Sequence, residues 1–269
     1  MRDDGRGKME DGSGKTEDGR WEMEEGSWMR EKIKQNEYLR YKTIIYKMNY
    51  ILPLLSVILG YAIALFIKPK KKNNLKLLLA FSGSFLLSIT VMHLLPDVYV
   101  KHNLSVGIFI MLGILFQIIL EFFSKGAEHG HVHGHDKLTQ MPWLLFISLC
   151  IHAFLEGFPV GHHHDLAYGI AIHHLPIAII LTTFFLNAQL NKTALFLFMI
   201  SFAVMTPLGT FVSDYFPILN QYYTQITAIV IGILFHISST IIFESSEGHK
   251  FNIAKISMII LGILLACFV

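Results

Sequence analysis

Long apolar runs separated by short polar loops fill the sequence from Met48 to Val269. A helix that crosses a bilayer needs about 20 mostly apolar residues, each adding about 1.5 Å. Eight runs meet or approach that length. They cover residues 50–67, 75–99, 105–123, 142–160, 166–186, 193–211, 223–243 and 253–269. Because the runs lack the alternation of barrel strands, we expect an all-α integral membrane protein with eight transmembrane helices.

The basic residues of the loops predict the orientation of these helices. Lys and Arg collect in loops on the cytoplasmic side of a membrane. One alternating set of loops carries ten basic residues, whereas the other set carries only Lys101. We therefore expect the 124–141 loop to be cytoplasmic and both ends of the 48–269 core to lie outside. A multi-pass protein of the cell membrane follows from this prediction.

Residues 1–47 differ from the core in composition. They hold eleven of the 22 Lys and Arg residues and eleven of the 20 Asp and Glu residues. A segment so polar cannot bury enough apolar surface to offset the entropy of ordering, so we expect a disordered tail with a basic connector over residues 29–47. It lacks the features of a signal peptide, and its charge conflicts with an outer N-terminus. The tail is either part of the native chain or upstream, non-native sequence, and in the second case Met48 is the physiological start.

All 14 histidines lie in the core, and several fall inside apolar runs. Ionisable side chains within a span are costly, so they mark a pathway or a ligand site by default. His152 and Glu156 are four residues apart, which stacks them on one helical face. An imidazole nitrogen and a carboxylate oxygen suit a divalent cation such as Zn²⁺. The alternative is a simple His–Glu hydrogen bond between packed helices.

A second group of polar residues inside a span consists of the adjacent His173 and His174, followed by Pro176. Neighbouring helical residues point about 100° apart, so one imidazole can face the run 142–160 while the other faces elsewhere. Pro176 removes a backbone donor and should loosen the helix one turn earlier. Both histidines are therefore candidate metal ligands, with a hydrogen bond to a carbonyl as the alternative for His174.

Polar residues near the outer ends of the spans predict an entrance. His93 and Asp97 are four residues apart ahead of the outer interface, and they form either an entrance site or an interfacial cap. The loop between the runs 142–160 and 166–186 adds three further imidazoles, which are either metal-binding or merely solvated: His162, His163 and His164. Inside the run 223–243, we expect a structural role for His236.

The 124–141 loop contains four histidines spaced by glycine and valine. Such a tract binds Zn²⁺, Ni²⁺ or Cu²⁺ reversibly, unless it is only a solvated loop. The residues are His129, His131, His133 and His135.

The ordered set of motifs resembles the ZIP (Zrt-, Irt-like) family of metal-ion transporters. It comprises H-L-L-P-D from His93, a His-rich loop, H-x-x-x-E-G from His152, H-H-L-P from His173 and P-L-G from Pro207. The resemblance covers most of residues 48–269. It implies eight helices and uptake of divalent metal, chiefly Zn²⁺, into the cytoplasm through the runs 142–160 and 166–186.

Three positions depart from members of that family with a two-metal centre. Such members commonly carry a carboxylate at the position of Ile177, Asn or Asp at Ala153 and a carboxylate at Thr206. We infer a mononuclear centre in which His173, one turn before Ile177, supplies the missing ligand. A centre rich in imidazole should favour Zn²⁺ over Mn²⁺, with Fe²⁺ also open as a transported substrate.

Two other functions compete with transport. A membrane metallohydrolase of the multi-histidine, ceramidase-like kind would use three ligands, an open position for water and Glu156 as the base. A metal sensor or store is the third interpretation. We expect a transporter rather than an enzyme, with divalent metal ions and the lipid bilayer as partners and a homodimer left open. The formal net charge of +2 is too small to indicate nucleic acid.

Overall fold

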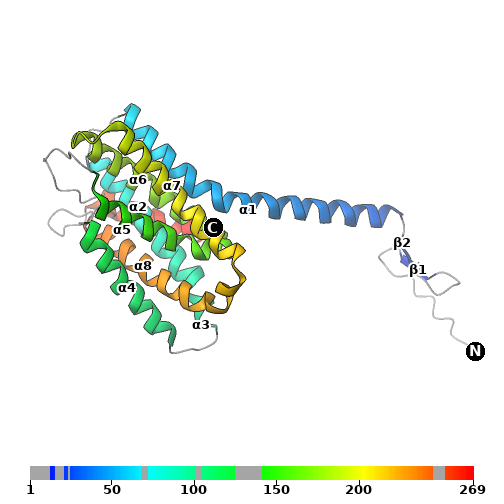
Figure 1. Cartoon of the computed structure of the whole chain (residues 1–269). Coiled ribbons are helices and arrows are strands. Elements are labelled where there is room, and N and C mark those ends of the chain that lie inside the picture. Colours follow the sequence, from blue (N-terminus) through cyan, green and yellow to red (C-terminus); the bar gives the residue numbers. More distant parts are fainter. Residues whose placement is uncertain are drawn as a thin grey trace, which may run out of the picture. The chain divides into compact units, whose positions relative to one another are not determined.

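The computed structural model describes residues 13–15, 21–23, 25–67, 72–100, 105–124, 141–244 and 252–269. Its contacts divide the chain into two compact units, Met1–Lys47 and Met48–Val269. In the first unit, strands β1 (Ser13–Lys15) and β2 (Trp21–Met23) pair antiparallel, with Gly14 opposite Glu22. Every other regular element in the described residues is helical (Figure 1).

The helices follow the apolar runs closely. They are α1 (Glu25–Ile67), α2 (Lys72–Ile89), the π-helix η1 (Thr90–Leu94), α3 (Leu95–Tyr99), α4 (Ser105–Ser124), α5 (Trp143–Glu156), the 3₁₀-helix η3 (Phe158–Gly161), α6 (His164–Asn187), α7 (Lys192–Tyr215), the 3₁₀-helix η4 (Pro217–Tyr222), α8 (Tyr223–Glu244) and α9 (Ile253–Ala266).

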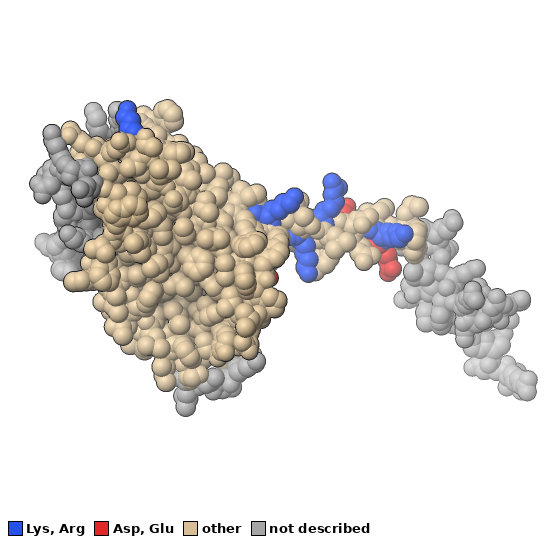
Figure 2. Space-filling model, viewed as in Figure 1, with Lys and Arg blue, Asp and Glu red and all other residues tan. Residues whose placement is uncertain are grey.

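Within the described residues, seven helical segments are long and apolar enough to cross a membrane, and each overlaps one of the first seven predicted runs. The eighth run forms α9, whose 14 residues span about 21 Å, short of the roughly 30 Å of a hydrocarbon core. The unit Met48–Val269 therefore has the character of a multi-pass membrane protein. The visible face of that unit carries almost no charged side chains (Figure 2).

The basic connector, residues 29–47, is helical. Helix α1 begins at Glu25 and includes the whole basic connector, whose side chains are nearly all exposed. Lys32 lies 3.8 Å from the ring centroid of Trp28, one turn earlier. Once nucleated, a helix extends at low cost through good helix formers such as Glu, Lys, Arg and Gln. The connector is therefore helical even though its side chains are exposed.

Glycines let pairs of helices in the second unit approach closely. Helix α4 packs on α8, where a methyl group at Gly113 would collide with the carbonyl oxygen of Ile229. Helix α5 packs on α7, where a methyl group at Gly209 would collide with the carbonyl oxygen of Phe154. Small residues at such crossings allow backbone contact between membrane helices. The α5–α7 crossing fixes the helix that carries His152 and Glu156.

Two prolines shape the helices that carry the candidate ligands. Helix α6 runs from His164 to Asn187 without interruption at Pro176, although this residue cannot donate a backbone hydrogen bond. Near the end of the second run, Pro96 cannot donate to the carbonyl one turn earlier, and the chain forms the wider π-helical turn η1 just before it. His93 lies in this turn.

Candidate metal centre

Helix α5 supplies two of the predicted ligands at its C-terminal end. Nε2 of His152 lies 3.2 Å from Oε1 of Glu156, as expected for side chains one turn apart. His152 is 2% exposed and Glu156 is fully buried. The helix ends directly after Glu156, because the chain turns at Gly157 into η3, which contains Pro159. The carboxylate therefore lies at the end of a helix, inside the bundle.

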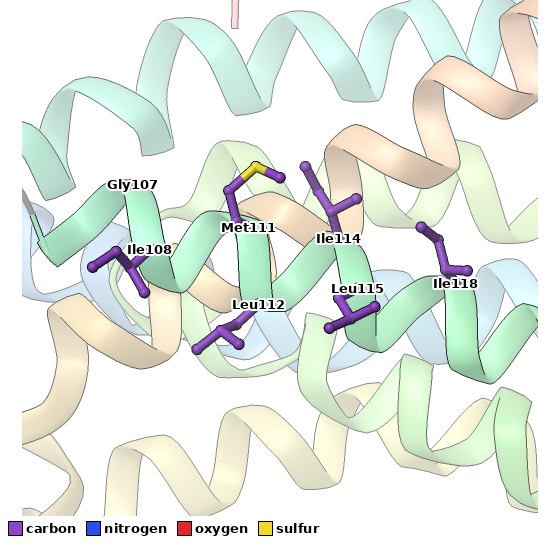
Figure 3. Close-up of a pocket in the computed structure, with 7 residues that line it drawn as sticks. All are labelled: Gly107, Ile108, Met111, Leu112, Ile114, Leu115 and Ile118. Atoms are coloured by element: carbon purple, nitrogen blue, oxygen red, sulfur yellow. The ribbon is translucent and has the colours of Figure 1, made fainter.

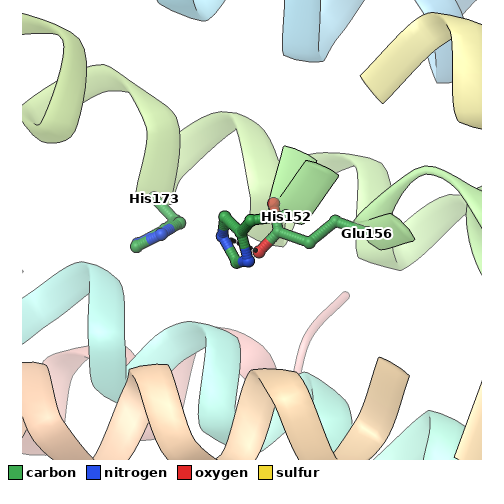
Figure 4. A group of neighbouring side chains, drawn as sticks. All are labelled: His152, Glu156 and His173. Carbon is green, nitrogen blue, oxygen red and sulfur yellow. Dashed lines mark ion pairs between the residues drawn. The ribbon is translucent and has the colours of Figure 1, made fainter. Parts of the chain in front are cut away.

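Helix α6 brings His173 to the same place. One ligand atom each from His152, Glu156 and His173 lies within 4.8 Å of the other two, and this is the only such group of three among the described residues. His173 is 2% exposed. Figure 4 shows His152 and Glu156 in contact, with His173 on a separate helix beside them. The structure thus brings together three of the four residues predicted as metal ligands.

The donor set fits a borderline divalent cation. Two imidazoles and one carboxylate are common ligands of Zn²⁺, and they leave a fourth position open. Within the described residues, Oε1 of Glu156 accepts no hydrogen bond of good geometry, although it is buried. Buried carboxylate oxygens are normally satisfied. A cation bound between Glu156 and the two histidines would satisfy this oxygen.

His174 lies beside the group but not in it. Its Nε2 lies 3.0 Å from Oε2 of Glu156, whereas the 3.2 Å contact with His152 involves Oε1. Its ring packs on that of Phe202 in α7, with centroids 5.3 Å apart. The residue is 1% exposed. Of the two adjacent histidines, one joins the three-residue group and the other contacts its carboxylate.

Two of the three positions that depart from the two-metal pattern carry apolar side chains. Ala153 and Ile177 are buried in the larger apolar core, together with Leu149 and Phe202. The third position, Thr206, is fully buried, and its hydroxyl has no hydrogen-bond partner among the described residues. None of these three side chains adds a carboxylate or an imidazole to the centre.

The predicted entrance residues form two crossed pairs with residues near the start of α6. His93 and Asp97 do not contact each other as a one-turn pair: Nδ1 of His93 lies 2.8 Å from Asp165, and Nε2 of His163 lies 3.3 Å from Asp97. The π-helical turn at residues 90–94 changes the helical register between His93 and Asp97. Two crossed His–Asp pairs therefore join the segment around Pro96 to the start of α6.

The remaining predicted residues are more dispersed. His162 is exposed, and its ring centroid lies 4.5 Å from that of Tyr223, whereas His164 is exposed at the first turn of α6. The His-rich tract lies outside the described residues. It comprises His129, His131, His133 and His135.

Sequence reasoning missed two long-range polar contacts in the second unit. Nε2 of His236 in α8 lies 2.6 Å from Oε2 of Glu121 in α4, and the hydroxyl of Tyr50 in α1 donates to Asp214 in α7, also at 2.6 Å. An acidic residue inside the apolar run 105–123 was the available signal for Glu121. The contact with Glu121 supports the structural role expected for His236.

A groove on the surface of α4 has no candidate metal ligand in its lining. It is lined by apolar side chains and one glycine, which include Ile108, Met111 and Ile118 (Figure 3). No titratable side chain lines it. Among the described residues, the group of three candidate metal ligands lies instead between α5 and α6.

No protein-family model and no curated protein sequence matches this chain. The assignment of function consequently depends on the composition of the helices and the geometry of the His152–Glu156–His173 group.

Proposed function

We propose that this protein is a transporter of divalent metal ions, with Zn²⁺ as the preferred substrate. The observation that carries the proposal is the buried group of His152, Glu156 and His173 inside a bundle of apolar, membrane-length helices. Ligands at this depth have little structural justification, because a buried carboxylate between imidazoles is costly unless a cation or hydrogen bonds compensate it. A transported cation provides that compensation.

The donor set also suits passage rather than permanent storage. Three protein ligands with a single negative charge leave a coordination position for water, so a bound ion can exchange ligands. Conduction needs a site that binds strongly enough to admit an ion and weakly enough to release it. The ordered motifs and loop charges support a ZIP-like protein of the cell membrane, with eight spans, outer termini and uptake into the cytoplasm.

The crossed pairs at the predicted outer side extend this proposal. Two carboxylates and two imidazoles from separate segments would attract a hydrated cation before it reaches the buried group. The residues are His93, Asp97, His163 and Asp165. Each pair is partly exposed, so solvent reaches it. We propose this cluster as the entrance.

A membrane metallohydrolase would use the same side chains differently. Glu156 is the only carboxylate in the three-residue group, and it cannot be both a ligand and the general base. A hydrolase would therefore hold its metal with two histidines only. A ligand role for Glu156 favours transport, and a lipid-hydrolysis assay on the same preparation separates the two functions.

The direct test is uptake of radiolabelled Zn²⁺ into proteoliposomes. We expect uptake by the intact chain and near-complete loss in His152→Ala, Glu156→Ala and His173→Ala. His102→Ala, in a predicted outer loop, is the control and should retain uptake. Zn²⁺ uptake and binding at the wild-type level in the His152→Ala/His173→Ala double variant would refute the site. Lipid hydrolysis without uptake would refute transport.

A further inference from the structure

The carboxylate of Glu156 is contacted by imidazoles on both oxygens. Oε1 lies 3.2 Å from Nε2 of His152, and Oε2 lies 3.0 Å from Nε2 of His174. All three residues are at most 2% exposed, so water does not compete for either oxygen. The two oxygens nevertheless differ, because only the contact with His174 has hydrogen-bond geometry.

The proton of His174 follows from this contact. An ionised carboxylate only accepts hydrogen bonds, so Nε2 of His174 carries the proton and donates it to Oε2. A protonated nitrogen cannot bind a metal. The other ring nitrogen, Nδ1, has no partner among the described residues, and His174 lies outside the three-residue group. The ring is held in place against Phe202.

We propose that His174 is a positioning residue that sets the metal specificity of the centre, an inference that rests on the proposed metal-transport function. Its donation uses one of the two lone pairs of Oε2 and so favours Oε1 as the oxygen with which Glu156 binds a cation. The centre then offers two imidazole nitrogens, one carboxylate oxygen and one open position. This set gives the four-coordinate geometry that Zn²⁺ accepts readily.

The same arrangement disfavours competing cations. Mn²⁺, Mg²⁺ and Ca²⁺ prefer six or more ligands, mostly oxygen, and Ca²⁺ in particular often takes both oxygens of one carboxylate. A Glu156 side chain with a free Oε2 could bind such ions through both oxygens. The hydrogen bond from His174 makes that binding mode less favourable. It also orients the ligand, as hydrogen bonds to metal-binding side chains generally do.

The test uses two substitutions and a matched control in the full chain, purified in detergent. His174→Leu removes the donor and keeps an apolar side chain beside Phe202, while His174→Gln can still place an amide N–H near Oε2. His236→Leu is the control, since it removes the imidazole from another helix-to-helix His–Glu pair of the described residues, the partly exposed contact with Glu121. Two quantities are measured: the visible absorption of bound Co²⁺, which is intense only for four-coordinate sites, and the ratio of Zn²⁺ to Mn²⁺ affinity in competition.

We expect four-coordinate Co²⁺ absorption in the wild type, in His174→Gln and in His236→Leu. His174→Leu should weaken this absorption, lower the Zn²⁺ affinity about 10- to 100-fold, the range seen when partners of ligands are removed, and reduce the Zn²⁺/Mn²⁺ ratio. A merely structural role would lower both affinities together and leave the ratio unchanged.

Three results would overturn the inference. Wild-type absorption and ratio in His174→Leu would show that the hydrogen bond does not restrict Glu156. Loss of a nitrogen ligand from the Co²⁺ spectrum in His174→Gln would make His174 a ligand. A change in the ratio in His236→Leu as large as in His174→Leu would attribute it to general disruption. Should His174→Leu fail to fold, His174→Met, which also lacks a donor for Oε2, is measured against His174→Gln in the same way. Absence of Co²⁺ and Zn²⁺ binding in the wild type would instead refute the proposed function.

Discussion

A methyl group at Gly157 should destabilise the helix crossing that positions Glu156. Gly157 adopts φ −68° and ψ −23°, which alanine tolerates, so the cost of Gly157→Ala is steric rather than conformational. The added Cβ would collide with the carbonyl oxygen of Thr206 and lie 2.9 Å from the backbone nitrogen of Thr210. Both partners are backbone atoms of α7, so neither can rotate away and the two helices must separate.

The magnitude follows from two opposing effects. Overpacking of this kind costs about 1–3 kcal/mol, whereas replacing glycine by alanine at a compatible conformation gains about 0.4–1 kcal/mol. The net loss should be about 1 kcal/mol, or a decrease in Tm of about 2–4 °C for a unit of this size. Because Glu156 directly precedes Gly157, Zn²⁺ affinity should also fall.

Gly107→Ala is the matched control. There the added Cβ would meet only the hydroxyl oxygen of Tyr99, at an ordinary distance of 3.6 Å. The substitution lies inside α4 and should therefore raise the stability by about 0.8–1 kcal/mol through helix propensity. Thermal unfolding and Zn²⁺ binding of both variants are measured in detergent. Equal Tm values for Gly157→Ala and Gly107→Ala would refute the steric argument, as would unchanged Zn²⁺ affinity in a destabilised Gly157→Ala.

Four further predictions concern the proposed transport. Changing His129, His131, His133 and His135 to Ser should leave uptake active, since the tract lies outside the apolar runs; complete loss at normal expression would contradict this. A chain that starts at Met48 should insert and transport, whereas failure to insert would show that the first unit is required. Ile177→Glu should broaden uptake toward Mn²⁺ or Fe²⁺ by restoring a carboxylate one turn after His173, and unchanged selectivity would count against that geometry. Zn²⁺ affinity should fall as the pH drops below about 6.5, because metal binding needs neutral imidazole; titrations that show no dependence on pH would exclude histidine ligands.

The sequence alone determined the features that depend on local chemistry. Hydropathy predicted the positions of the helices, because backbone groups in a bilayer must be satisfied within each segment. The pairing of His152 with Glu156 was equally predictable, because residues one turn apart meet on the same helix whatever surrounds them. The same rule failed for His93 and Asp97, where a π-helical turn changed the local register.

Only the tertiary structure decided which residues from different helices meet. His173 and His174 are the same residue type and adjacent in sequence. The rotation of α6 against α5 nevertheless places His173 in the three-residue group and brings His174 into contact with Oε2 of Glu156. The partners of Glu121 and Asp214 lie 115 and 164 residues away in the chain. Such contacts depend on the crossing angle and register of packed helices, which arise from the fit of many side chains and glycines at once rather than from any one segment.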